Sequence, residues 1–159
     1  LAGVSGWTLT TSGYREHSRQ VAAEMADADA DAKRAVLAVY EDFIPLNERF
    51  LAALTHWKVR PTPLEPQAAN DHRDPRWDER VLIGLHVLVR EVRPLCARLE
   101  QVLDRFGGYE DRLTTALRRV DRGEMAWLDQ LRNVSLHAVW LELFDDLRMS
   151  LQVEEAAGA

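Results

Sequence analysis

The sequence predicts an all-α protein, namely a helical bundle of four to five helices preceded by one short N-terminal strand. Apolar residues recur at steps of three and four residues through most of the chain between residues 14 and 153, which is the period of amphipathic helices. Loop-forming residues gather only near 59–76, 107–108 and Gly123. At 159 residues and 47% apolar content, the chain can bury one core without disulfide or metal support.

Residues 1–13 differ from the rest of the chain. After Gly6, the run Trp7-Thr8-Leu9-Thr10 alternates large and β-branched residues, which predicts a short strand that Thr11-Ser12-Gly13 should end. A first helix is predicted over residues 14–26, with Ser12 as its N-cap. The sequence therefore divides into a strand segment, 1–13, and a helical domain, 14–159.

The second predicted helix covers residues 30–57 and leads into the one long loop. Pro45 falls opposite its apolar face, so we expect the helix to kink or restart there. Four prolines punctuate the loop at 59–76, a length typical of functional or mobile segments. The apolar face of the helix is formed by Val36, Tyr40, Phe43, Phe50, Leu51 and Leu54.

Three further helices are predicted over residues 75–106, 109–122 and 124–153. The first begins with Asp74 as N-cap and Pro75 at its first position, and Gly107-Gly108 ends it. It carries a heptad seam, formed by Val81, Leu85, Leu88, Val92, Leu95, Leu99, Val102 and Phe106. The last helix has an apolar stripe formed by Leu136, Val139, Trp140, Leu143, Phe144, Leu147 and Leu151.

Composition excludes several classes of function. A net charge of −6 argues against a chain that coats nucleic acid by itself, and no apolar run is long enough to span a membrane. A lone cysteine, Cys96, rules out a disulfide framework and fits a reducing, cytoplasmic setting. It lies on the seam side of its helix, so we interpret it as a core residue and not as a nucleophile.

No strong catalytic, metal or cofactor motif is present, and we expect neither a metal nor a cofactor. The cluster Asp71-His72-Arg73-Asp74 lacks the three or four converging ligands that a metal site needs, and it is better explained as a turn followed by a helix cap. A metal site there is the weaker alternative.

Four residues are predicted to line a cavity for a small, partly aromatic molecule: Asn47, Trp57, His137 and Trp140. Asn47 lies within the apolar face of its helix and His137 borders an apolar stripe, and sparse polar groups in apolar walls orient ligands. The loop at 59–76 would act as a lid. The alternative is a solid core, in which Asn47 and His137 bond each other or the backbone.

The segment Trp7-Thr8-Leu9-Thr10-Thr11-Ser12-Gly13 resembles the last wing strand of bacterial winged-helix transcriptional regulators of the MarR and PadR type. The remainder is similar to the helical C-terminal part of a group of MarR-like regulators. This resemblance implies a homodimeric ligand-sensing and dimerisation domain that reaches DNA only through an N-terminal reader missing from this sequence. The matching stretches are Tyr40-x-x-Phe43-x-x-Leu46-Asn47, Trp57, Arg105-Phe106-x-x-Tyr109-x-x-Arg112-Leu113 and Ser135-x-His137-x-x-Trp140-x-Glu142-Leu143-x-x-Asp146-Leu147.

Two other readings of the sequence stay open. One is a stand-alone helical-bundle enzyme of the isomerase or cyclase kind, which would use His137 with Glu142 or Asp71 with His72. The other is a protein-interaction module. The heptad seam independently favours a homodimer through the helix at 75–106 or at 124–153, unless the two apolar seams pack against each other within one chain.

Overall fold

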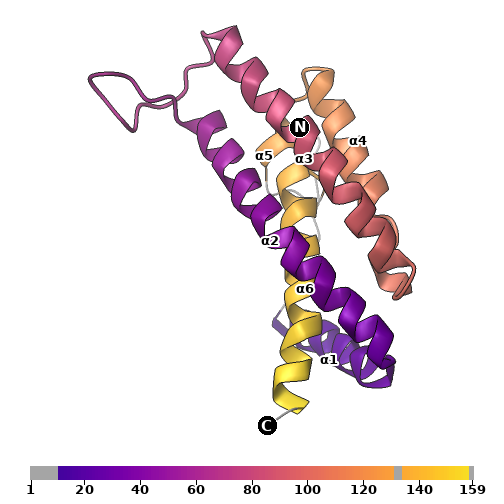
Figure 1. The fold of residues 1–159 in the computed structure, drawn as a ribbon. Helices are drawn as coiled ribbons and strands as arrows, with labels where there is room; N and C mark the ends of the chain where they lie inside the picture. The colour runs from indigo at the N-terminus through magenta and orange to yellow at the C-terminus, as the bar shows by residue number, and fades with distance from the viewer. Residues whose placement is uncertain (1–10, 131–133, 158–159) are drawn as a thin grey trace.

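The protein is all-α, as the sequence predicts. The computed structural model describes residues 11–130 and 134–157, so the predicted strand at 7–10 lies outside the described residues (Figure 1). Within them there are six α-helices and one 3₁₀ turn. These are α1 (Thr11–Asp27), α2 (Ala30–Lys58), α3 (Pro75–Glu100), η1 (Asp104–Phe106), α4 (Tyr109–Asp121), α5 (Ala126–Asp129) and α6 (Leu136–Ala157).

The start of α1 corrects the prediction for residues 11–13. Thr11, Ser12 and Gly13 form the first turn of the helix, so they do not break the chain and Ser12 is not an N-cap. Neither threonine nor serine blocks a helix, and one glycine costs only about 1 kcal/mol there. The helix is held in place further along, where Val21 and Met25 are buried in the core.

The hairpin of α2 and α3 largely follows its local sequence signals. The Asp74 side chain caps α3 and Pro75 occupies its first turn, as predicted. Of the kink or restart predicted for α2 at Pro45, the restart is wrong, since the helix runs unbroken from Ala30 to Lys58. Pro45 is exposed, so the backbone carbonyl that loses its partner faces water, where the loss is tolerated.

Two predicted helices are each divided in the structure. The helix predicted over 75–106 ends at Glu100, and the separate turn η1 then brings Phe106 into the core while Val102 stays only half-buried. The helix predicted over 124–153 is split into α5 and α6, because Gln130 adopts an extended conformation and the Ser135 hydroxyl caps a new start by accepting from the Ala138 amide at 3.1 Å. The second split raises the number of α-helices to six, above the predicted four to five.

Helix α6 forms the centre of the bundle. It packs against α1, α2, α4 and α5, while α3 packs against α2 and α4 (Figure 1). Most residues of the two predicted apolar seams are therefore buried within one chain. On α6 the fully buried members are Leu136, Val139, Trp140, Leu143 and Leu147. Among the described residues, no helix combines the length and the apolar character that crossing a membrane requires.

Candidate functional site

Asn47 and Trp140, two of the four predicted site residues, contact each other directly. The indole Nε1 of Trp140 donates a hydrogen bond to Oδ1 of Asn47 at 3.0 Å, and both side chains are buried. The bond joins α2 to α6. The partner of the buried amide is therefore a side chain of another helix, and not the backbone or His137 as the solid-core alternative supposed.

Aromatic rings surround this pair on the α2 side. Phe50 stacks on the Trp140 ring with 4.2 Å between centroids and 6° between planes, and Phe43 packs against it at 5.1 Å. His137 lies at the edge of the group, 6.2 Å from the Phe50 ring. Since Trp140 has no exposed surface, the structure places Asn47 and Trp140 in a packed core. Their role in binding a ligand stays a prediction.

His137 is half-buried at the start of α6, and its surroundings favour the neutral imidazole. Its Nδ1 atom is buried and has no hydrogen-bond partner among the described residues. Burial lowers the pKa of His137, and the positive charge of Lys58 lowers it further. Asp129 opposes both effects through a backbone hydrogen bond and its charge, but the net pKa shift is downward.

Trp57 belongs to a different cluster, at the base of the long loop. Its ring lies 4.5 Å from that of His72, and its backbone oxygen accepts a hydrogen bond from the buried Asn70 side chain at 3.0 Å. Asn70 also donates to Asp78 at 2.8 Å, and Asp78 holds Nδ1 of His72 at 3.0 Å. The loop is thus braced at its base by polar contacts.

The loop projects away from the bundle between α2 and α3 (Figure 1). A bridge between Val59 and Ala69 closes it, and Leu64 near its tip is 98% exposed. The role of the loop as a lid stays a prediction. Asp71 accepts from the Arg73 amide within its own turn and Asp74 caps α3, which agrees with a turn and helix cap. The described residues contain no group of three or more metal-ligating side chains placed to hold an ion.

The side chains named for an enzyme have other partners. Glu142 accepts two hydrogen bonds from Arg112, at 2.9 and 2.5 Å, and is half exposed to solvent. His72 is held by Asp78. Cys96 is buried, and this burial raises the pKa of its thiol to about 12, so the thiolate that a nucleophile needs is scarce.

An open groove between α2 and α3 is a feature that the sequence analysis missed. Its volume is about 410 Å³. Small residues leave the space, because Ala52 and Ala53 of α2 face Gly84 of α3 and a Cβ atom added to Gly84 would meet nothing within 4 Å. A glycine inside an otherwise regular helical pattern, beside the seam of α3, was the available signal. The groove is lined by Arg49, Ala52, Ala53, His56, Trp77, Arg80, Val81, Gly84 and Leu88.

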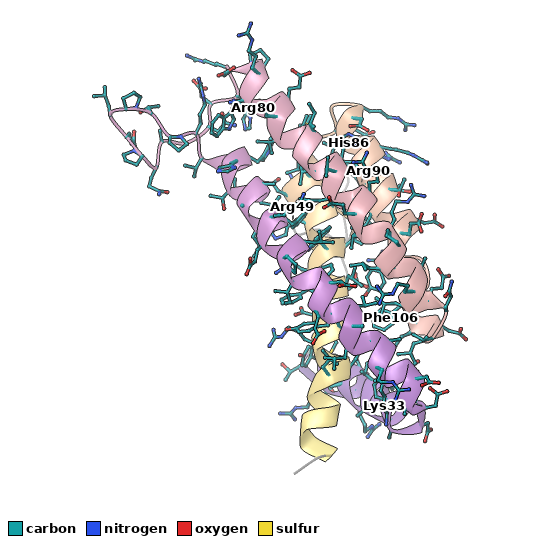
Figure 2. All side chains as sticks on the ribbon, viewed as in Figure 1. Lys33, Arg49, Arg80, His86, Arg90 and Phe106 are labelled. Atoms are coloured by element: carbon teal, nitrogen blue, oxygen red, sulfur yellow. The ribbon has the colours of Figure 1, made fainter. Side chains whose placement is uncertain are left out.

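Charged side chains border this apolar groove. Arg49 pairs with Glu91 of α3 at 2.5 Å. The Arg80 guanidinium lies over the Trp77 ring, 5.2 Å from its centroid, and the Trp77 indole is fixed by a 2.8 Å hydrogen bond to the His56 backbone oxygen. Figure 2 shows Arg49 and Arg80 on the α2–α3 hairpin. The groove therefore combines apolar walls with a fixed aromatic ring and a guanidinium held above it.

A second, more polar hollow of about 360 Å³ lies between α3 and α4. Two of its four basic groups are paired with acids, since His86 bonds Asp121 at 2.8 Å and Arg93 bonds Glu110 at 2.6 Å. Arg90 and Arg118 also line it. Figure 2 shows His86 and Arg90, which both belong to α3.

A buried polar network centred on Asp146 fixes α1 to the bundle, and the sequence patterns did not predict it. The carboxylate accepts from the Tyr109 hydroxyl at 2.5 Å and lies 3.1 Å from Nε2 of His17 in α1. Arg105 bonds Glu24 of α1 and Ser150 of α6. Burial, with the Asp146 charge, raises the pKa of Tyr109, so the phenol stays protonated and donates.

We expect the Asn47–Trp140 contact to be a major source of stability. Trp140→Ala should lower the free energy of unfolding by roughly 3–5 kcal/mol, because it empties a core position. Asn47→Ala should cost about 1–3 kcal/mol, because the buried indole N–H loses its acceptor. Urea unfolding measures both. The exposed neighbour Glu48 is the control, and Glu48→Ala should stay within about 0.5 kcal/mol. A cost below about 1 kcal/mol for Trp140→Ala would contradict a packed core.

The lowered pKa of His137 predicts a pH dependence of stability. In the unfolded chain a histidine takes up a proton below about pH 6.5, whereas folded His137 resists protonation until lower pH. Stability should therefore fall as the pH drops from about 6.5 through the lowered pKa. In His137→Gln this contribution is absent, so the unfolding midpoint of the variant should fall less between about pH 7.5 and about pH 5. Parallel pH curves for the two proteins would contradict the assignment.

The glycine in the groove is not required by the backbone of α3. Gly84→Ala should raise stability by about 0.5–1 kcal/mol, because alanine favours the helix and its methyl group has open space. Gly123 is the matched control, since its φ of 84° lies in the left-handed region. Gly123→Ala should destabilise the protein by roughly 1 kcal/mol. Thermal unfolding of both variants tests the pair, and destabilisation by Gly84→Ala would mean that the groove is tighter than described.

Comparison of the chain with protein-family models, curated proteins and solved structures finds no match.

Proposed function

We propose that this chain is the ligand-sensing and dimerisation domain of a winged-helix transcriptional regulator. The observation that carries the sensing role is the groove between α2 and α3. A volume of about 410 Å³, apolar walls and a few placed polar groups are the attributes of small-molecule sites. The groove lies between two long helices of the bundle, which hold its walls in place.

A series of contacts connects the groove to α1, which supports a sensing role and not ligand binding alone. Helix α2 lines the groove and also carries Asn47, which bonds Trp140 of α6. Helix α6 in turn carries Asp146, which holds His17 of α1. Since α1 follows the segment that resembles a wing strand, ligand-dependent movement of α2 has a physical route to the place where a DNA reader would attach.

The enzyme alternative receives less support from the geometry. Glu142 is held by two hydrogen bonds from Arg112, and His72 is held by Asp78. The hydrogen bond of His137 goes to the backbone of Asp129, and Glu142 is bonded by Arg112, so the described contacts do not join the two residues that this alternative pairs. Sensing without catalysis is the simpler account of these contacts.

The dimer interface is proposed on the outer face of the α2–α3 hairpin. The predicted seam of α3 and the stripe of α6 are largely occupied inside the bundle, so neither is free for a second copy. The hairpin still exposes large apolar side chains, with Ile83 of α3 55% exposed and Leu37 and Leu51 of α2 more than 40% exposed. Exposed large apolar side chains favour association, and these three belong to the two helices of one hairpin.

The sensing role is tested with a thermal-shift screen of small organic molecules on this chain, followed by hydrogen exchange. A ligand should raise the melting temperature by binding the folded state. It should also change the exchange rates of backbone amides in α1, although α1 does not line the groove. If a ligand stabilises the protein but leaves the amide exchange rates of α1 unchanged, the chain binds the ligand without transmitting a signal, and the sensing role is contradicted. The absence of any stabilising compound would contradict sensing.

The dimer is tested separately by sedimentation. At tens of micromolar the chain should sediment as a dimer, and Ile83→Asp should convert it to a monomer because a buried carboxylate at the interface is costly. Leu64→Asp is the control, since this leucine is 98% exposed and belongs to the loop that projects away from the bundle. A monomeric parent protein would reject the dimer.

In a mobility-shift assay at low salt the isolated chain should bind DNA weakly or not at all, owing to its net charge of −6.

A further inference from the structure

We propose that the α2–α3 groove binds an apolar monocarboxylate, whose carboxylate is gripped by Arg80 and whose hydrocarbon body lies along the small-residue floor. This inference rests on the proposed sensing function and names the chemical class of its ligand. The groove shape, the charge state of its arginines and the orientation of Trp77 each support it.

The groove is a narrow trough. Its α2 wall is built from positions 49, 52, 53 and 56, and its α3 wall from positions 77, 80, 81, 84 and 88. These spacings place each set along one stripe of its helix. At 1.5 Å per residue, the walls are about 10 and 16 Å long. Where the two walls meet, Ala52, Ala53 and Gly84 form the floor of the trough. None of them has a hydrogen-bonding side chain, so the floor suits the hydrocarbon body of a ligand.

Arg80 is the basic group of the groove that is free to bind an anion. Arg49 is already neutralised by Glu91. Arg80 has no carboxylate within 4 Å among the described residues, and instead lies over the Trp77 ring. Trp77 is itself fixed by its bond to the His56 backbone oxygen. The guanidinium is therefore positioned before a ligand arrives, which lowers the entropy lost on binding.

One guanidinium fork matches one carboxylate. The two parallel N–H donors of an arginine bind both oxygens of a carboxylate, and a single positive charge balances a single negative charge. A phosphate group with nearly two charges would be left partly unpaired at this site. The α3–α4 hollow has more basic groups, but it is more polar and two of them are paired with acids, so it does not offer the same apolar trough.

The test uses octanoate as the probe, with octan-1-ol and octylamine as its uncharged and cationic counterparts. Isothermal calorimetry gives the dissociation constants for the full chain. Octanoate should bind at least tenfold more tightly than either counterpart, because a hydrogen bond to a charged group is worth roughly tenfold or more. In the ¹H–¹⁵N spectrum, octanoate should shift the indole signal of Trp77, assigned with Trp77→Phe, and leave that of buried Trp140 unmoved.

Two substitutions test the site itself. Arg80→Ala should weaken octanoate binding about tenfold or more. The affinity of Arg80→Lys should lie between those of the parent protein and Arg80→Ala, because lysine keeps the positive charge but cannot donate two parallel hydrogen bonds to one carboxylate. Gly84→Leu should abolish binding by filling the trough, while the open space at this position lets the protein fold. Arg90→Ala is the matched control: Arg90 is another exposed arginine of α3, but it lines the α3–α4 hollow, and its loss should leave affinity unchanged.

The outcomes separate this inference from the proposed function. If octanoate fails to bind while another class of compound stabilises the parent protein and not Gly84→Leu, the ligand class is wrong and the sensing groove stands. Equal octanoate affinity in all variants would mean non-specific binding and would overturn the inference. If Gly84→Leu turns a dimeric parent into a monomer and octanoate does not bind, the occupant is a second copy of the chain, and the inference is again overturned.

Discussion

The structure depends on the burial of one side chain, Trp140. Its ring is fully buried, and its indole N–H must still donate a hydrogen bond to an acceptor. A buried donor without a partner costs about 1–3 kcal/mol, so α2 and α6 must meet in the one register that places Asn47 opposite the indole. Phe50 then stacks on the same ring and excludes other packings of that face. This contact fixes α2 against the central helix, and the remaining helices pack around the pair.

Helix α2 consequently has two roles on two faces. Its inner face carries Phe43, Asn47 and Phe50 into the core, and its outer face presents Ala52 and His56 to the groove. A rigid helix cannot move one face without the other. A ligand that pushes α2 away from α3 must therefore disturb the aromatic contacts with α6, or move α6 along with α2. Because Asp146 of α6 holds α1 through His17, such a disturbance extends toward the N-terminal end of the described chain.

Local signals in the sequence predicted the fold better than the candidate site. The cap at Asp74, the turn at Gly123 and the helical period of the seams depend on neighbouring residues, and the structure confirms them. The division of the last helix was missed, because no glycine or proline marks residues 130–135 in the sequence and the break depends on the extended Gln130. Asn47 was recognised as a buried polar group that needs a partner, but that partner lies 93 positions away and no local pattern identifies it. The groove was missed for the same reason, because it exists only where two separate helices face each other.

The groove is also the place where the chain departs from what stability alone would favour. Glycine inside α3 costs the helix about 0.5–1 kcal/mol relative to alanine, and here no positive φ or close contact requires it. A larger residue at position 84 would cover apolar wall that is now open to water, and each buried CH₂ group would contribute about 0.8 kcal/mol. An unfilled trough next to a guanidinium that has no acidic partner in the described part of the chain therefore leaves two interactions unused in the free protein. Departures of this kind from the locally favoured residue are expected at functional sites, and both are offset when a molecule with a hydrocarbon body and one negative charge occupies the groove.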